Sequence, residues 1–399
     1  MTNLLILPVA IPLLAALLAL ISPRYSNLIG VTTAALTATA ATGLVMLIAH
    51  SGTQILILGG WSPGLGIALY ADGLSALMLL MSGLVATAAS IFSCRYFEGS
   101  ATRTYFWPLW LLLQAAISAL LLSADLFNLY VTLELLGLSA VSLTALGNNR
   151  LALKAALNYL LLGLLGSLVF LAAVVLIYAR YSTLDILLLS SMIGPEPITW
   201  VALALFTASL LLKCALFPLH FWLPTVHANA PAPVSAALSA LVVKVAFYLL
   251  LRLWFDLFAP VITPPLASAL GILGAIAILW GSYRAIQAER LKLLAAYSTI
   301  AQLGYLFLFF SLLVALPPGE TQKMLYGALL LFVLTHGFAK SALFMAAGAV
   351  QQQLGHDRIA ELGGLARTFP LTVFTLALAG VALIGLPPSG SFLAKWHLM

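Results

Sequence analysis

The chain has 399 residues, of which 63% are hydrophobic and only 7% are charged, and its mean hydropathy is +1.13. Soluble domains are about 45–50% apolar and about 25% charged, so this composition excludes a soluble enzyme, a nucleic-acid-binding protein and a disordered chain. The net charge of +6 comes from basic residues scattered between apolar stretches, which is typical of membrane topology and not of nucleic-acid binding. The sequence predicts an all-α polytopic membrane protein that lies in the lipid bilayer.

The two cysteines, Cys94 and Cys214, lie in or beside apolar segments. Their number and spacing support neither a disulfide framework nor a metal site with four ligands. No cysteine cluster indicates an iron–sulfur centre, and no CxxCH motif indicates c-type haem. We therefore expect no metal, no cofactor and no redox centre in this sequence.

Apolar stretches divide the chain into membrane helices, each of which needs about 20 residues. Twelve such stretches predict about twelve transmembrane helices, at residues 4–22, 27–50, 73–95, 105–123, 126–147, 152–178, 199–219, 233–256, 265–288, 290–317, 322–350 and 370–399. The first predicts a retained helix and not a signal peptide, because no Lys or Arg precedes it. Residues 51–72 predict an extramembrane hairpin or loop, and residues 351–369 predict a polar connection with a short surface helix.

The basic residues between these stretches predict the orientation of the chain in the membrane. One set of alternate loops holds most of them: Arg24, Arg95, Arg103, Arg150, Lys154, Arg284, Arg290, Lys292, Arg358 and Arg367. The other set holds Arg180, Arg252 and Lys323. Because cytoplasmic loops carry the excess of Lys and Arg, the N-terminus is expected outside and the loop with Arg24 in the cytoplasm.

Four lysines and one carboxylate remain inside apolar segments: Lys213, Lys244, Lys340, Lys395 and Glu134. A charge at the bilayer centre costs about 2.5–3.5 kcal/mol, so such residues usually face a protein interior and mark ion or proton paths. One carboxylate cannot neutralise four lysines, and an ammonium that is not neutralised in an apolar environment releases its proton more readily. The pattern favours proton handling; the alternative is that each lysine only binds an unpaired carbonyl or one ion-pair partner to hold helices together.

Two further groups of polar residues lie in the same part of the chain. His336 and Lys340 are four residues apart and share a helix face, where an imidazole that titrates near neutral pH could relay a proton. Alternatively, the histidine is capped by a backbone or hydroxyl partner. Ser298, Thr299 and Gln302 could hold water or hydrogen-bond neighbouring helices.

Two helices are interrupted. Lys213 is followed by Pro218, His220, Pro224 and His227, and the segment GLPPSGSF interrupts the last apolar run just before Lys395. Proline blocks helix continuation, and a pair of interrupted segments in two parts of a chain is typical of inverted-repeat transporters. Loop punctuation explains the first interruption nearly as well, but not the second. Together they suggest two half-channels, each with a lysine beside a break.

Four motifs carry a resemblance to a known family: DLFNLYVTLELLGLSA, KCALFPLHFWLPTVHANAPAPVSAALSALVVK, LKLLAAYSTIAQLGY, and HGFAKSALFMAAG followed by GLPPSGSFLAK. From roughly residue 70 onward, the chain resembles the antiporter-like subunits of respiratory complex I, membrane-bound hydrogenases and Mrp-type sodium/proton antiporters. The wording DLFNLYVTLE and the lysine at 395 look most like the Mrp D-type subunit.

The resemblance implies two inverted five-helix repeats, with discontinuous seventh and twelfth helices. We expect N-terminal helices over 1–104, a first repeat over 105–256 and a second over 265–399. Family members usually have fourteen helices, so the second repeat is expected to be incomplete.

The resemblance also implies a mid-membrane path for protons. Its six members would be Glu134, which pairs reversibly with Lys213, then the connecting Lys244, the linking His336 and Lys340, and the terminal Lys395. Asp125 would lie near an entrance, and His220, His227, Ser298 and Gln302 would hold water or line the approach. None of them is expected to be catalytic in the chemical sense.

The implied function is that of a proton-translocating subunit of a multisubunit cation (Na+)/proton antiporter in the cell membrane of a prokaryote, with other membrane subunits as partners. The nearest alternative is the same module in a complex I-like NADH:quinone oxidoreductase or a membrane hydrogenase. An organic-solute carrier, in which the broken helices bind substrate, and a purely structural scaffold are alternatives of other classes.

Overall fold

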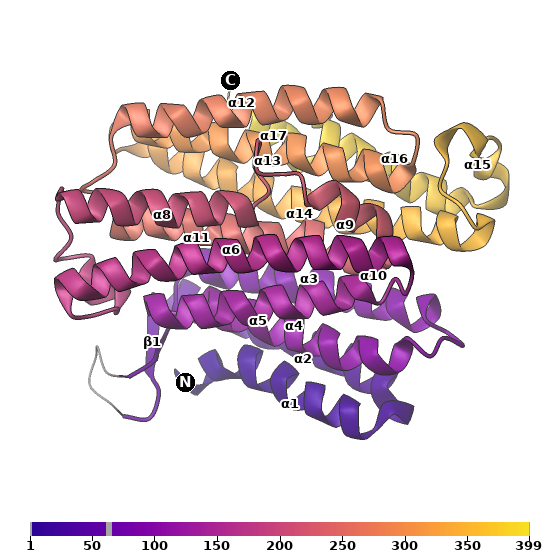
Figure 1. The fold of residues 1–399 in the computed structure, drawn as a ribbon, viewed down its shortest axis with the longest axis horizontal. Helices are drawn as coiled ribbons and strands as arrows, with labels where there is room; N and C mark the ends of the chain where they lie inside the picture. Colours follow the sequence, from indigo (N-terminus) through magenta and orange to yellow (C-terminus); the bar gives the residue numbers. More distant parts are fainter. Residues whose placement is uncertain (1, 61–65, 399) are drawn as a thin grey trace. The chain divides into compact units, whose positions relative to one another are not determined.

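The structure is a computed structural model that describes residues 2–60 and 66–398 and is mostly helical (Figure 1). Ten helices of the described chain are long and apolar enough to cross a membrane: Leu4–Ile21, Pro23–Ser51, Gly73–Tyr96, Arg103–Leu122, Leu126–Ala145, Arg150–Tyr181, Ala232–Leu257, Pro264–Ile286, Leu291–Ala315 and Glu320–Leu354. Two shorter apolar helices, Pro197–Lys213 and Pro370–Ile384, correspond to the two interrupted segments. The predicted fold class is confirmed, while the inverted relation of the repeats stays a prediction.

The helices gather in two compact units, of which the first comprises residues 1–148, 156–213 and 245–262. Its helices are η1 (Thr2–Ile6), α1 (Leu7–Ile21), η2 (Pro23–Tyr25), α2 (Ser26–Ser51), α3 (Gly73–Tyr96), α4 (Arg103–Leu122), α5 (Leu126–Ala145), most of α6 (Arg150–Tyr181), α7 (Ile186–Leu189), α8 (Pro197–Lys213), most of α11 (Val243–Arg252) and η4 (Leu253–Leu257). The core forms around α4, where the indole N–H groups of the buried Trp107 and Trp110 donate to Asn27 at 2.7 Å and Ser90 at 2.9 Å. Each large apolar side chain thus keeps its polar atom satisfied.

The second unit comprises residues 149–155, 214–244 and 263–399. Its helices are α9 (Leu223–Asn229), α10 (Ala232–Ala237), η3 (Leu238–Val242), α12 (Pro264–Ile286), α13 (Leu291–Ala315), α14 (Glu320–Leu354), η5 (Ile359–Glu361), α15 (Leu365–Thr368), α16 (Pro370–Ile384) and α17 (Gly390–Trp396). A Cβ atom at Gly304 of α13 would lie 2.4 Å from the carbonyl oxygen of Gly274 on α12, so glycine permits this close packing. The helix α14 packs against α10, α13, α16 and α17.

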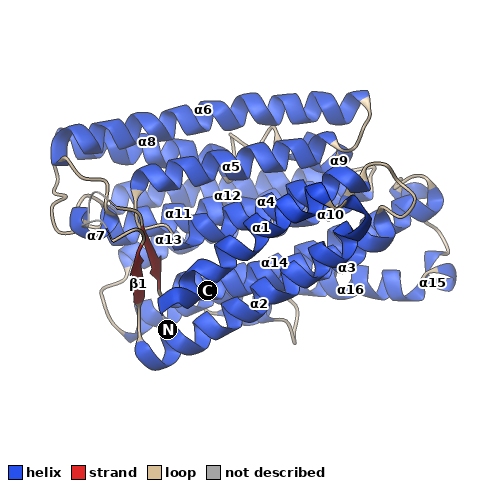
Figure 2. Ribbon diagram, turned by 90° about the horizontal axis from the view of Figure 1, so that it is seen from below, coloured by secondary structure: helices blue, strands red, loops and turns tan. Residues whose placement is uncertain are grey.

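The predicted hairpin at 51–72 is present. Strands β1 (Gln54–Ile57) and β2 (Ala68–Ala71) pair antiparallel, with Gln54 opposite Ala71, and are drawn in red in Figure 2. Residues 61–65 of the predicted segment lie outside the described residues. The polar connection at 351–369 contains two short helices, η5 and α15.

The interrupted helices end where the sequence predicts a break, although α8 stops at Lys213 and not at residue 219. After α16, Gly385 adopts φ +82°, a left-handed conformation that favours glycine, and two prolines follow. Ser389 then caps α17 by accepting the amide of Phe392 at 3.2 Å. Each break leaves a helix end, with its unpaired main-chain groups, inside an apolar part of the sequence.

Candidate functional site

In the first unit, Lys213 and Glu134 interact electrostatically. Lys213 is the last residue of α8, and its Nζ donates hydrogen bonds to the hydroxyl of Ser167 at 2.7 Å and to the carbonyl of Gly163 at 3.3 Å, both on α6. Glu134 is half-buried on α5. No ion pair joins the two in the described part of the chain, so α6 and not the carboxylate holds this ammonium.

In the second unit, Lys244 is fully buried at the start of α11. Its Nζ donates to the main-chain carbonyl of Ser239, which lies in the π-helical segment η3. In an α-helix the amide of Val243 would donate to that carbonyl, four residues back, but here it donates to the carbonyl of Leu238, five residues back. The π-turn therefore releases the Ser239 carbonyl for the ammonium.

Lys340, fully buried on α14, binds the segment LKLLAAYSTIAQLGY of α13. Its Nζ donates to the carbonyl of Ala295 at 2.8 Å and to the hydroxyl of Ser298. The same carbonyl accepts the hydroxyls of Ser298 at 3.0 Å and Thr299 at 2.9 Å. One α13 carbonyl is thus the shared acceptor of an ammonium and two hydroxyls.

A hydroxyl pair connects this group to the π-turn. The Oγ1 of Thr299 lies 2.8 Å from the Oγ of Ser239, and both side chains are fully buried. Because Thr299 donates its only hydroxyl proton to Ala295, Ser239 is the donor within the pair. A continuous hydrogen-bonded network therefore runs from the turn that holds Lys244 to the carbonyl that holds Lys340.

His336 lies one turn before Lys340 on α14 and is 1% exposed. Neither ring nitrogen has a hydrogen-bond partner among the described residues. The charges of Lys244, Lys340 and Lys395 all interact with the ring. The imidazole is therefore within electrostatic range of three of the predicted lysines.

Lys395 lies beside the break between α16 and α17. Its Nζ is 3.1 Å from the carbonyl of Ile384 and 3.4 Å from that of Leu383, at the end of α16. Gln302 donates to the Leu383 carbonyl at 2.9 Å, and the ring of Tyr305 lies 4.3 Å from the ammonium. The negative end of a helix dipole and an aromatic face thus surround this cation.

The remaining predicted residues occupy separate places. Asp125 caps α5 by accepting the amide of Asn128 at 2.8 Å, and burial raises the pKa of its carboxyl, although this hydrogen bond opposes the rise. His220 accepts the indole N–H of Trp280 at 3.1 Å. His227, on α9, stacks on Phe344 with 4.6 Å between ring centroids. Asp125 and His220 are not brought together with the buried lysines, whereas His227 interacts with Lys244 and Lys340.

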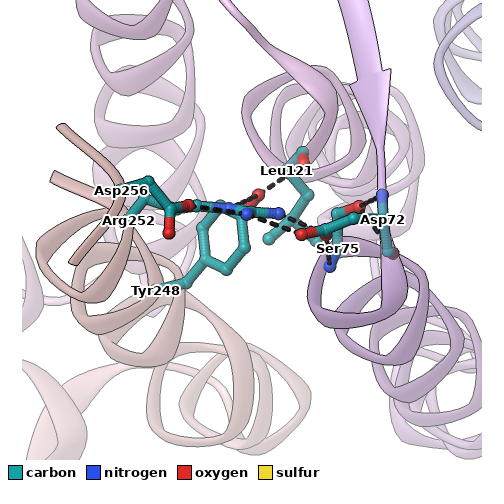
Figure 3. Close-up of polar contacts among 6 residues, drawn as sticks. All are labelled: Asp72, Ser75, Leu121, Tyr248, Arg252 and Asp256. Atoms are coloured by element: carbon teal, nitrogen blue, oxygen red, sulfur yellow. Dashed lines mark hydrogen bonds and ion pairs between the residues drawn. The ribbon is translucent and has the colours of Figure 1, made fainter. Parts of the chain in front are cut away.

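Sequence reasoning missed the burial of Arg252, which it had treated as a loop charge. Its guanidinium donates to both carboxylate oxygens of Asp72, to Asp256 at 2.8 Å and to the hydroxyl of Tyr248 at 3.1 Å (Figure 3). Burial raises the pKa of Asp72, but the hydrogen bonds and charge of Arg252 and the bonds from Ser75 outweigh it and hold this pKa below its ordinary value. The spacing of Arg252 and Asp256, four residues apart, is the signal that could have indicated this pair.

Lys292 was likewise counted as a loop charge, but it is the second residue of α13 and only 2% exposed. With Lys244 and Lys340, it is one of three fully buried lysines of the described chain, whereas Lys213 and Lys395 are half-buried. No signal in the sequence distinguishes it from its neighbours, the exposed Glu289 and the half-buried Arg290. Among the described residues, no cluster of three His, Cys, Asp or Glu side chains could hold a metal ion.

The chain is similar to known proteins in both its sequence and its fold. The family described as NADH:quinone oxidoreductase/Mrp antiporter, transmembrane, matches residues 123–399. The N subunit of the NADH-quinone oxidoreductase of Desulforudis audaxviator is 35% identical over 403 residues, which cover 99% of this chain and 78% of the relative. The D-type subunit of the Na(+)/H(+) antiporter of Alkalihalophilus pseudofirmus is 28% identical, with 100% and 80% covered. A chain of the Mrp complex from Dietzia sp. superposes with a TM-score of 0.90 at 27% identity, with 100% and 74% covered.

Proposed function

Because the chain belongs to the NADH:quinone oxidoreductase/Mrp antiporter transmembrane family, we propose that it is a proton-translocating membrane subunit of a multisubunit cation/proton antiporter. The observation that carries the proposal is the way the buried lysines are held. Lys244, Lys340 and Lys395 donate to main-chain carbonyls and hydroxyls in one unit, and all three interact electrostatically with His336, whose ring nitrogens have no hydrogen-bond partner among the described residues. Neutral acceptors let an ammonium lose its proton without leaving a buried anion behind.

In the proposed cycle, Glu134 and Lys213 alternate between a paired and a separated state. When they pair, the carboxylate favours the charged form of Lys213; when they separate, as in the structure, the buried ammonium tends to lose its proton. That proton is taken up by Lys244 and moves through His336 to Lys340 and Lys395. A histidine suits the linking position because imidazole both accepts and donates a proton near neutral pH.

The proposal includes partners and an orientation. The relatives named above are subunits of complexes, and we expect this chain to assemble with other membrane subunits and to move protons and Na+. We place it in the inner membrane of a prokaryote, with the N-terminus outside and the loop with Arg24 in the cytoplasm, from the excess of basic residues in that set of loops.

A specific observation favours a second candidate. Of the two relatives, the N subunit of an NADH-quinone oxidoreductase has the higher identity, 35% against 28%. In that case the same lysines would move protons as part of a complex I-like enzyme. The subunits that copurify with the chain distinguish the two: small antiporter subunits support the first candidate, and quinone- or NADH-binding subunits support the second.

Transport in membrane vesicles that contain the assembled complex tests the function. Glu134→Ala, Lys213→Ala and Lys244→Ala are each expected to abolish transport that depends on a pH gradient, because each removes one proton carrier while the complex still assembles. The exposed pair of Lys323 and Glu320 offers a control, since Lys323→Ala should leave transport unchanged. Near-normal transport in Glu134→Ala, Lys213→Ala and Lys244→Ala would contradict the proposal and favour a structural scaffold.

A further inference from the structure

Lys292 is buried, and its ammonium is bound to a helix end. Its Nζ donates to the main-chain carbonyl of Ala230, the residue that follows α9. The last carbonyls of a helix have no partner within the helix, so this acceptor is available for the ammonium. Lys292 is therefore bound in the same way as the lysines of the predicted proton path, by an uncharged main-chain carbonyl oxygen.

The nearby Asp357 interacts electrostatically with Lys292 but forms no ion pair with its ammonium. Asp357 is buried, and one of its oxygens accepts the Nε of Arg290 at 2.7 Å while the other accepts the main-chain amide of Lys292 at 3.1 Å. No carboxylate of the described chain forms an ion pair with the Nζ of Lys292. A lysine in this position can be neutral at a lower cost than one paired with an anion.

The group also reaches the outside of the unit. The side chain of Arg290 is 32% exposed, and besides binding Asp357 it donates to the carbonyl of Ala228 at 3.1 Å. Lys292 thus lies one step inward from a charged, partly exposed pair.

His227 lies on the inward side. It is 1% exposed, its Nδ1 is buried without a hydrogen-bond partner among the described residues, and its ring interacts electrostatically with Lys292, Lys340 and Lys244. Buried polar atoms are rarely left unpaired, and an imidazole nitrogen without a hydrogen-bond partner is available to take a proton. His227 therefore interacts both with Lys292 and with two lysines of the predicted proton path in the same unit, Lys340 and Lys244.

We propose that Lys292 is a further proton-carrying residue, which passes protons from the edge formed by Arg290 and Asp357 through His227 to Lys340 or Lys244. In each transfer, an N–H bond of the Lys292 ammonium breaks as an N–H bond forms on His227. The imidazolium then gives its proton to a neutral lysine, and a proton that enters from solvent at the edge formed by Arg290 and Asp357 binds the neutral Lys292 amine and restores its ammonium. The inference rests on the proposed function of the chain.

Substitution of Lys292 by two residues separates proton transfer from a structural role. Lys292→Gln and Lys292→Arg are both expected to lower pH-gradient-driven transport in vesicles of the assembled complex by about tenfold or more. Arginine keeps the positive charge and can donate to Ala230, but it does not release a proton. A role as a clamp on α9 predicts instead that Lys292→Arg transports like the wild type, and this result would overturn the inference.

Two further measurements keep the test decisive. If Lys292→Gln does not assemble, the comparison of Lys292→Arg with His227→Gln still decides, because both are expected to lose transport and normal rates in both would reject the path. Lys323→Gln is the matched control, since that lysine is exposed. Normal transport in Lys292→Arg together with loss in Lys213→Ala rejects the inference alone, whereas near-normal transport in Glu134→Ala, Lys213→Ala and Lys244→Ala rejects the proposed function.

Discussion

Lys213, Lys244, Lys292, Lys340 and Lys395 each donate a hydrogen bond to a main-chain carbonyl. Three of these carbonyls are released by irregular helix geometry: Ser239 by a π-turn, Ala230 by the end of α9 and Ile384 by the end of α16. A carbonyl is a dipole without net charge, so the loss of a proton from the lysine leaves no uncompensated anion. Carbonyl binding therefore suits residues that change charge during a cycle.

Arg252 differs from these lysines, because it forms ion pairs with the carboxylates of Asp72 and Asp256 and keeps its charge. Asp72→Asn keeps the cap of α3 but removes the charge opposite Arg252, and we expect it to lower the free energy of unfolding by about 1–3 kcal/mol at neutral pH. The pKa of Asp72 is lowered in the folded state, so its contribution is complete above the unfolded pKa of about 3.9 and is lost as the pH falls through the lower folded value.

Thermal unfolding in detergent, followed from about pH 7 to about pH 3, measures this difference. The gap in Tm between wild type and Asp72→Asn should be constant down to about pH 4 and narrow below it. Asp256→Asn is the control, because that partner is half-exposed and should change Tm much less. A gap that stays constant over the whole range would show that the ion pair contributes nothing to the pH dependence.

At the scale of elements, the positions of the helix ends could be predicted from the sequence, but the contacts made by charged residues near those ends could not. Asp72 and Asp125 cap α3 and α5 just before apolar runs, and the prolines of GLPPSG mark the break before α17, so local chemistry sets these positions. Whether Lys292 and Arg252, at the ends of apolar runs, face solvent or protein depends on neighbours far away in the sequence. The positive-inside rule uses only the position of a basic residue along the chain, so it assigns both residues to loops.

The π-turn at η3 was also beyond sequence reasoning, since the sequence from Ala236 to Val243 reads as regular apolar helix. Its setting is defined by tertiary contacts, above all by the hydroxyl pair of Ser239 and Thr299. Predicted residues such as Lys244 and Lys340 were found by charge alone, but the residues that position them are neutral. Ordinary serines and threonines in an apolar run give no signal of this role.

Thr299→Val tests the hydroxyl pair. The change keeps the shape of the side chain but leaves the fully buried hydroxyl of Ser239 without its acceptor, which should lower the free energy of unfolding by about 1–3 kcal/mol. Denaturant unfolding in detergent measures it. Thr299→Ser keeps the hydroxyl and loses one methyl group, about 1 kcal/mol, and Ser239→Ala should cost little when added to Thr299→Val. Additive losses in that double variant would mean that the two hydroxyls do not depend on each other.

At the scale of the whole molecule, the uneven distribution of basic residues between the two sets of loops should fix how the chain crosses the membrane. We expect a cysteine at Ser191, in the loop between α7 and α8, to face the outside, and a cysteine at Gln353, at the end of α14, to face the cytoplasm. Both positions are exposed. In a background without Cys94 and Cys214, an impermeant thiol reagent should label Ser191→Cys in intact cells and Gln353→Cys only after the membrane is opened. Labelling of Gln353→Cys in intact cells would contradict the predicted orientation. Protons would then reach Lys292 from the outside and not from the cytoplasm.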